Sequence, residues 1–164
     1  MRAKQEEASI PSDGLFPGPK FDYQKYMEEN LKRFVSIRPE RKDTLENALS
    51  YYRIGVCAIN PYQAIESLFG AIQAIIMEVK KVKKPSGYIR QYIEPKIKDK
   101  TGMTKKEFTA KFEHYWDDYR SNATHGEYHV NDYSLLRDVN KGKHEVAKWT
   151  RIIIDDYIKE SSQA

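Results

Sequence analysis

The sequence predicts an all-α fold, a five- or six-helix up-and-down bundle, on three observations. Apolar residues recur every three or four positions in several segments, and breaks that contain proline or glycine separate these segments. One segment, residues 62–83, is apolar around much of its circumference and should be the central helix. No segment alternates apolar and polar residues for long enough to predict a sheet.

The length of 164 residues suits one domain with one hydrophobic core. Residues 1–20 contain three prolines and two glycines, so we expect a flexible leader there. Residues 21–160 should form a single helical domain, and residues 161–164 a tail. One cysteine excludes a disulfide within the chain, and no apolar run has the length of a membrane span. We therefore expect a cytoplasmic protein.

The first helix should cover residues 21–37, because Arg38-Pro39 ends its pattern. Asp43 or Thr44 is expected to cap the second helix, which should stop at Asn60-Pro61. Cys57 lies among apolar residues and should be a small buried side chain. Apolar residues on one side of the second helix are expected to face the core: Leu45, Ala48, Leu49, Tyr52, Val56 and Ile59.

The third helix should begin with Pro61 in its first turn and run to about Lys83. A short helix should follow and end before Pro95, which leaves residues 96–102 as a loop. Beyond that loop, a capping-box pattern opens a helix with an aromatic side. The residues concerned are Thr104 and Glu107 for the box, and Phe108, Phe112, Tyr115 or Trp116, and Tyr119 for the aromatic side.

The last apolar pattern starts after residue 132 and runs to about residue 158. It predicts either one long helix or two helices divided near Gly142, because glycine weakens a helix interior. With the earlier segments, this gives the five or six helices of the bundle.

Positive charge is concentrated between residues 80 and 111, where eleven basic and three acidic residues give +8 against −4 for the rest of the chain. Such a block is typical of a surface that binds a polyanion. It is equally typical of a solvated connection whose lysines interact favourably with the negative end of a helix dipole. The candidate RNA-binding side chains are Lys80, Lys81, Lys83, Lys84, Lys105 and Lys106.

The segment Tyr-Arg-Ser-Asn-Ala-Thr-His-Gly places a permanent cation and an imidazole at the end of the aromatic helix. Arg120 can hold a phosphate through two hydrogen bonds, and His125 can transfer protons near neutral pH. Gly126 can end the helix, which would place His125 in the last turn, where the dipole favours its charged form. Residues four apart share a side, so Asp117, Ser121 and His125 should form a polar stripe.

Arginine and histidine at this spacing, followed by glycine in an all-helical chain, resemble the signature of the HEPN domain family, and Tyr-Arg-Ser before His-Gly resembles its Apea-like branch. The resemblance covers about residues 42–160. It implies the HEPN fold and a homodimer, whose paired motifs cleave RNA without metal or cofactor and leave a cyclic phosphate. It also implies that Arg120 binds the scissile phosphate, that His125 is the acid or base, and that Ser121 and Asn122 position them.

The sequence departs from the family pattern at two positions. Ser121 follows the motif arginine, where many members have Asn, Asp or His. The central helix reads Ala-Ile-Gln-Ala around Gln73, where the family often has a glutamate. If that acid supports the arginine, Glu66 or Glu78 has to replace it. Gln73 and Asp117 are therefore candidate supporting residues.

Other interpretations remain open. A HEPN-like module without catalysis would dimerise, bind nucleotide or RNA, or serve an antitoxin or nucleotidyltransferase partner. Arg120 and His125 could instead stabilise the helix end, with Arg120 paired to Asp117. A metal site at His125, Glu127 and His129 is disfavoured, because Gly126 interrupts the helix that would align them. Several tyrosines could stack on bases if exposed, or pack half-buried: Tyr51, Tyr52, Tyr88 and Tyr92.

Overall fold

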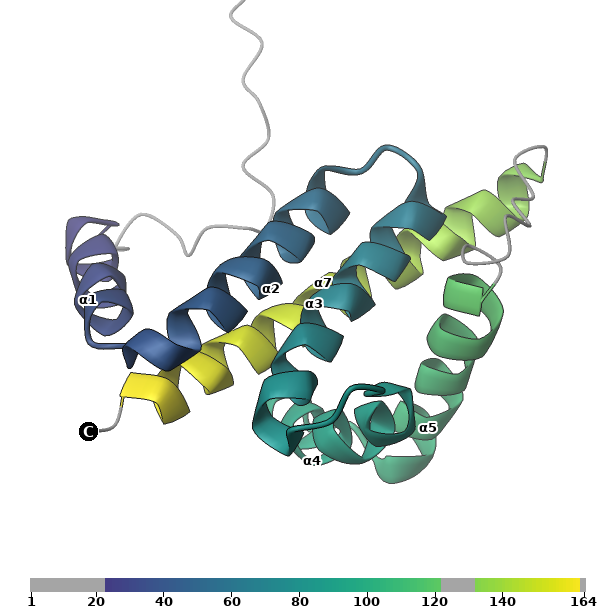
Figure 1. Ribbon diagram of the computed structural model, residues 1–164. Coiled ribbons are helices and arrows are strands. Elements are labelled where there is room, and N and C mark those ends of the chain that lie inside the picture. Colours follow the sequence, from purple (N-terminus) through teal and green to yellow (C-terminus); the bar gives the residue numbers. More distant parts are fainter. Residues whose placement is uncertain (1–22, 122–131, 163–164) are drawn as a thin grey trace, which may run out of the picture.

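The computed structural model describes residues 23–121 and 132–162. These residues form six α-helices, one 3-10 turn and one π-helical segment, and no strand occurs among them, so the all-α class is confirmed (Figure 1). The elements are α1 (Tyr23–Val35), α2 (Pro39–Cys57), α3 (Pro61–Lys80), η1 (Ser86–Tyr88), α4 (Ile89–Thr101), α5 (Lys105–Glu113), η2 (His114–Arg120) and α7 (Tyr133–Ser162). The predicted leader lies outside the described residues.

Helix α3 is the centre of the bundle, as predicted. It packs against α2, α7, α4 and η2, and nine of its side chains are buried (Figure 1). The Asn60 side chain caps its first turn, because its oxygen accepts hydrogen bonds from the Tyr62 and Gln63 amides at 2.9 and 3.4 Å. Lys81 adopts a left-handed conformation, with φ of 53°, and ends the helix before the predicted Lys83.

Helix α2 differs from its prediction at its start and on its apolar side. It begins at Pro39, because proline suits the first helical position, so the predicted caps at Asp43 and Thr44 are wrong. Cys57 is exposed, not buried. Among the predicted core residues, Leu45 and Ala48 are buried and Tyr52 is half-buried, whereas Leu49, Val56 and Ile59 are exposed.

Gly55 explains which side of α2 faces the core. It continues the buried side of Leu45 and Ala48 and is itself buried where α2 crosses α3. A methyl group at Gly55 would lie 2.6 Å from Leu68 Cγ and 2.9 Å from the Ala64 carbonyl oxygen. The two backbones therefore approach closely at Gly55, which has no side chain and so is not part of the apolar pattern.

Substituting Gly55 with alanine is expected to lower the free energy of unfolding by about 1–3 kcal/mol, since the methyl group forces the two helices apart. This cost outweighs the gain of about 1 kcal/mol in helix propensity. Urea denaturation of Gly55→Ala and wild type measures the difference. Gly87→Ala is the matched control, because no atom lies within 4 Å of its added methyl group. Equal stability of Gly55→Ala and wild type would contradict the close packing.

Helix α4 continues through Pro95, so the predicted loop at residues 96–102 is wrong. Its buried side consists of Ile89, Ile93 and Ile97, spaced four apart on both sides of the proline. Burial of this stripe holds the helix together where proline removes one backbone hydrogen bond. Beyond the proline, Lys96 contacts Asp156 and Glu160 of α7, the latter at 3.0 Å.

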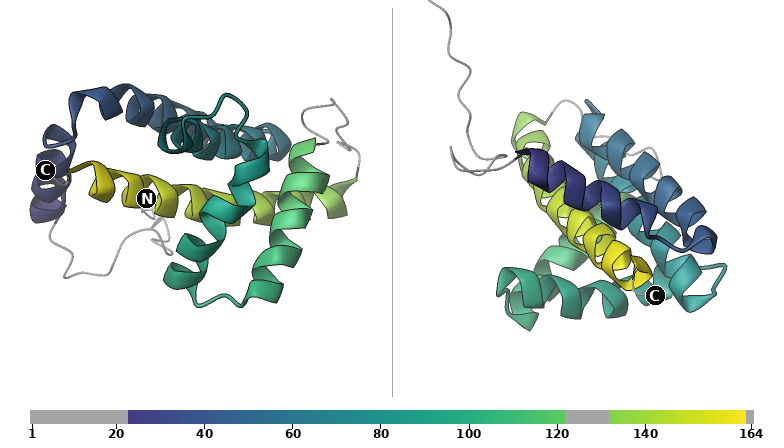
Figure 2. Two further views of the ribbon diagram at one scale, coloured as in Figure 1. Left: turned by 60° about the horizontal axis from the view of Figure 1, so that its bottom comes forward. Right: turned by 90° about the vertical axis from the view of Figure 1, so that its left-hand side faces the viewer.

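Helix α7 is one uninterrupted helix of 30 residues that lies behind α2 and α3 in Figure 1 and is seen from two further sides in Figure 2. Gly142 does not divide it. Instead, Gly142 is buried against two rings, since a methyl group there would lie 3.1 Å from atoms of both Tyr115 and Tyr119. The helix continues to Ser162, and the Ser161 hydroxyl accepts a hydrogen bond from Arg41 at 3.2 Å. The last turn thus includes part of the predicted tail.

The half-buried Tyr92 predicts a loss of stability at alkaline pH. Burial, opposed by Lys96 and assisted by nearby acids, raises its pKa from 10.0 to about 12. The folded state therefore favours the neutral phenol, so its stabilising effect is complete below pH 10 and is lost as the pH rises through about 12. Denaturant unfolding at increasing pH should show this fall, and Tyr92→Phe should lose less stability over the same interval. An identical fall in the variant would exclude Tyr92 as a cause.

Candidate functional site

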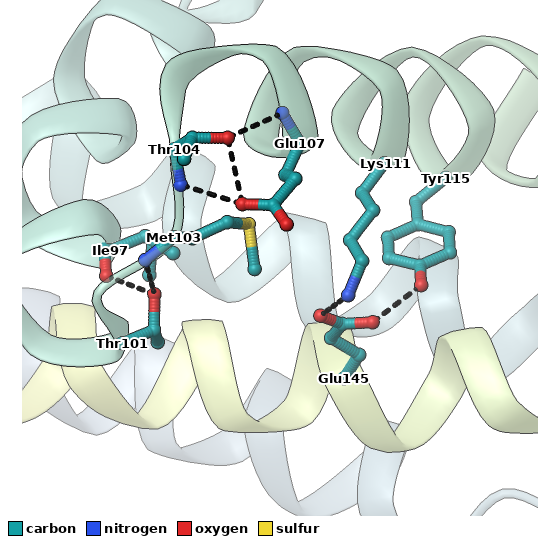
Figure 3. Close-up of polar contacts among 8 residues, drawn as sticks. All are labelled: Ile97, Thr101, Met103, Thr104, Glu107, Lys111, Tyr115 and Glu145. Atoms are coloured by element: carbon teal, nitrogen blue, oxygen red, sulfur yellow. Dashed lines mark hydrogen bonds and ion pairs between the residues drawn. The ribbon is translucent and has the colours of Figure 1, made fainter.

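The helix that carries the motif begins with the predicted capping box. The Glu107 amide donates to the Thr104 hydroxyl at 3.2 Å, and the Thr104 amide donates to the Glu107 carboxylate at 2.8 Å (Figure 3). After Glu113 the helix widens into the π-helical segment η2, which ends at Arg120. A π-helical turn is rare and often occurs at functional sites. Regular helical spacing did not predict it.

The aromatic side of this helix is buried as predicted. Phe108, Phe112, Tyr115 and Tyr119 belong to the core, and Trp116 packs against it while remaining partly exposed. Tyr115 and Trp116 were alternatives in the sequence, but both contact the core because η2 is wider than an α-helix. The Trp116 ring meets the Phe69 ring edge-on, with centroids 4.9 Å apart.

Glu145 of α7 holds this helix in place. Its carboxylate accepts hydrogen bonds from Lys111 at 2.5 Å and from the Tyr115 hydroxyl at 2.6 Å (Figure 3). Burial, together with the hydrogen bond to Glu145, raises the pKa of Tyr115. The phenol therefore stays a hydrogen-bond donor at neutral pH. These contacts fix the first turn of η2, and no spacing in the sequence pointed to Glu145.

Arg120 is positioned by Trp116. Its guanidinium carbon lies 4.5 Å from the centroid of the Trp116 ring, a favourable cation–π distance. Because Phe69 in turn contacts Trp116, a chain of packed rings connects the core to the charge. Arg120 is therefore held as part of the folded structure rather than extended into solvent.

Arg120 forms part of the wall of an open pocket of about 770 Å³ between α2 and α3. Gln73 and both candidate replacement acids, Glu66 and Glu78, line the same pocket. Residues far apart in the sequence are thus brought together around the motif arginine. The full lining consists of Thr44, Asn47, Tyr51, Glu66, Ser67, Gly70, Gln73, Ala74, Met77, Glu78 and Arg120.

The two acids differ in their surroundings. Glu78 lies 2.9 Å from Lys81 and 4.0 Å from Arg41, and it accepts a hydrogen bond from Tyr157 at 3.4 Å. These contacts hold the Glu78 side chain near the C-terminal end of α3. Glu66 lies three turns earlier, in the half of α3 nearer its N-terminus. Glu66 is therefore the better of the two candidate acids to support Arg120.

The other predicted site residues are placed differently. Asp117 is exposed and is not among the described residues that line the pocket. The Ser121 hydroxyl donates to the Trp116 carbonyl at 3.4 Å, which stabilises the end of η2. Asn122 and His125 lie outside the described residues, so the second half of the motif is known from the sequence alone.

The basic block does not form one surface. Lys80, Lys83 and Lys84 are exposed around the end of α3, and Lys105 and Lys106 are exposed at the start of α5. Helix α4 lies between these groups, and its thirteen residues span about 20 Å. Other members form ion pairs with neighbouring acids: Lys81, Arg90, Lys96, Lys98, Lys100 and Lys111. Three of these residues, Arg90, Lys96 and Lys111, join different helices, so part of the block takes part in the packing of α4 and α5.

Within residues 23–121 and 132–162, no group of three or more His, Cys, Asp and Glu side chains could hold a metal ion. The disfavoured candidates Glu127 and His129 lie outside these ranges. Over the same part of the chain, no helix combines the length and apolar character needed to cross a bilayer.

No protein-family model, curated protein or solved structure matches this chain. The resemblance to HEPN domains consequently depends on the motif residues themselves. Function has to be inferred from the pocket and from the residues that surround Arg120.

Proposed function

We propose that this protein is a HEPN-like, metal-independent endoribonuclease whose site contains Arg120 and His125. The position of Arg120 is the observation that supports this function. The side chain is held over Trp116 at the wall of a pocket that has both polar and apolar lining and is large enough for a nucleotide. A planar guanidinium in such a setting suits a phosphate group, because its paired N–H groups match two phosphate oxygens.

The proposed reaction is internal transfer of a phosphate ester. The 2′-oxygen of a ribose attacks the adjacent phosphorus while the bond from phosphorus to the 5′-oxygen breaks. A base removes the proton of the 2′-hydroxyl, and an acid supplies a proton to the leaving 5′-oxygen. Arg120 stabilises the charge that develops on the phosphate, and His125 acts as acid or base. The products are a 2′,3′-cyclic phosphate and a 5′-hydroxyl.

A homodimer belongs to this proposal, because one Arg-His pair supplies few groups for both proton transfers. Three apolar side chains of α2, the helix that also lines the pocket, are exposed, and so is a fourth just after its end: Leu49, Ile54, Val56 and Ile59. Apolar side chains of this kind are suited to contact between subunits.

The deciding experiment incubates the purified protein with a mixed RNA pool in excess EDTA and maps the new ends. We expect cleavage that leaves cyclic phosphate, and loss of that cleavage in His125→Ala. His144→Ala is the matched control, because His144 is exposed on α7 and remote in sequence from the motif. Intact RNA after incubation with wild type, or cleavage that EDTA abolishes, would reject the proposal.

A second candidate function is a module that binds nucleotide or RNA without cleaving it. The observation that favours it is Gln73, an amide at the position of the family glutamate, on the wall shared with Arg120. Such a module would serve a separate antitoxin or nucleotidyltransferase. RNA binding with no cleavage by wild type, together with a gene for such a partner beside its own, would support this alternative.

A further inference from the structure

Among the four tyrosines considered for base stacking, one lies at the pocket. Tyr52 and Tyr92 are half-buried, and Tyr88 is 41% exposed on η1, outside the described lining of the pocket. Tyr51 is 45% exposed and lines the pocket with Arg120. An exposed aromatic ring beside a phosphate-binding cation is a combination that nucleotide sites use.

Gly70 of α3 supports one face of the Tyr51 ring. A methyl group at Gly70 would lie 3.2, 3.4 and 3.5 Å from three consecutive ring atoms, Cδ1, Cε1 and Cγ. Nearly equal distances place that methyl position above the face of the ring, because approach within the ring plane would leave Cε1 and Cγ much farther than Cδ1. The α3 backbone at Gly70 therefore covers one face of the Tyr51 ring. The exposed part of the ring is the part that does not face Gly70.

Polar groups beside the ring can recognise the edge of a base. Asn47 precedes Tyr51 by one turn of α2, and Gln73 follows Gly70 by one turn of α3, so the two amides come from both walls of the pocket. Each amide offers a hydrogen-bond donor and an acceptor, which are the groups that base edges require.

The charges of the pocket limit how much of a nucleic acid it holds. Arg120 is the one basic residue among the described residues that line it, and Glu66 and Glu78 are acidic. These carboxylates would repel a second phosphate, whereas they would not repel an uncharged base. The pocket is consequently suited to one phosphate and one base.

We propose that Tyr51, backed by Gly70, is a base-stacking residue, and that the pocket takes one nucleotide unit of single-stranded RNA, with its base on Tyr51 and its phosphate at Arg120. This subsite rests on the proposed function, since it assigns the phosphate to the same arginine. It adds a determinant of substrate choice: paired bases are excluded, because only an unstacked base can lie on the ring.

The test uses a short single-stranded RNA in which each 2′-hydroxyl is blocked as its methyl ether, which prevents cleavage, and a matched oligonucleotide that lacks its bases. Fluorescence anisotropy measures the affinity of each for the full chain. Wild type should bind the oligonucleotide with bases at least about tenfold more tightly, because stacking of one base on an aromatic ring has about this effect. Tyr51→Leu should lose this preference, and Tyr51→Phe should keep it.

Tyr88→Leu is the matched control, because Tyr88 is a similarly exposed tyrosine outside the pocket's described lining. Its preference should equal that of wild type. Thermal unfolding of each variant separates loss of binding from loss of folding, and Tyr51→Phe preserves the ring if Tyr51→Leu unfolds. Equal preference for bases in wild type and Tyr51→Leu would overturn the subsite.

The outcomes also separate this subsite from the nuclease. Base-dependent binding through Tyr51, without cleavage of natural RNA in EDTA, would retain the subsite and reject the nuclease. Cleavage that is unchanged in Tyr51→Leu, with equal affinity for both oligonucleotides, would reject the subsite and retain the nuclease. Absence of binding to either oligonucleotide, with natural RNA left intact in EDTA, would overturn both.

Discussion

Replacing Arg120 with alanine is expected to slow RNA cleavage in EDTA by about a hundredfold or more. Loss of one group that stabilises developing charge typically has an effect of this size. Under the proposed mechanism the phosphate gains charge in the transition state, so the rate of the chemical step should fall more than the affinity for RNA. Single-turnover cleavage of a defined RNA, at saturating protein, measures that step directly.

Two further variants make the result for Arg120 specific. Arg120→Lys retains the charge but loses the forked donors and the flat contact with Trp116, so its rate should lie between those of alanine and wild type. Arg137→Ala removes an exposed arginine of α7 and should leave the rate unchanged. A full rate in Arg120→Ala would show that phosphate stabilisation comes from another group.

Replacing Phe69 with alanine is expected to lower the free energy of unfolding by about 3–5 kcal/mol, the usual cost of removing a buried aromatic ring. Phe69 is fully buried in α3, and its ring contacts those of Phe112 and Trp116. Guanidinium denaturation measures this loss. Tyr88→Ala, which removes an exposed ring, should change stability by no more than about 0.5 kcal/mol.

Phe69→Leu connects this core position with the site. The variant should fold, because leucine keeps most of the apolar volume, but it removes the edge-on contact that holds Trp116 beneath Arg120. We therefore expect slower RNA cleavage by a protein that remains folded at the assay temperature. An unchanged rate would mean that Trp116 keeps its position without Phe69.

The sequence predicted those parts of the fold that depend on local signals. Helical spacing located α3 and the aromatic side of α5 and η2, and the capping box at Thr104 was correct because its hydrogen bonds join residues three apart. Predictions from local signals were wrong where contacts with distant residues determine whether a helix continues. Pro95 stays within α4 because buried isoleucines flank it, and Gly142 stays within α7 because two tyrosine rings pack on it.

The candidate site was predictable only in part for the same reason. Arg120 and Gln73 were identified from the motif and the central helix, and they share a pocket wall. Tyr51 gained significance only through its contact with Gly70, and Glu145 only through its hydrogen bonds to Lys111 and Tyr115. These partners are 19 to 34 residues apart in the sequence, so no spacing rule relates them.

The position of α7 at the end of the described chain has a consequence for protein synthesis. The ribosome makes α7 after α1, α2, α3, α4 and η2, all of which it contacts, so the core cannot close until α7 emerges. Glu145, which anchors η2, arrives with it. The support that positions η2 and Arg120 is therefore complete only after α7 has been made.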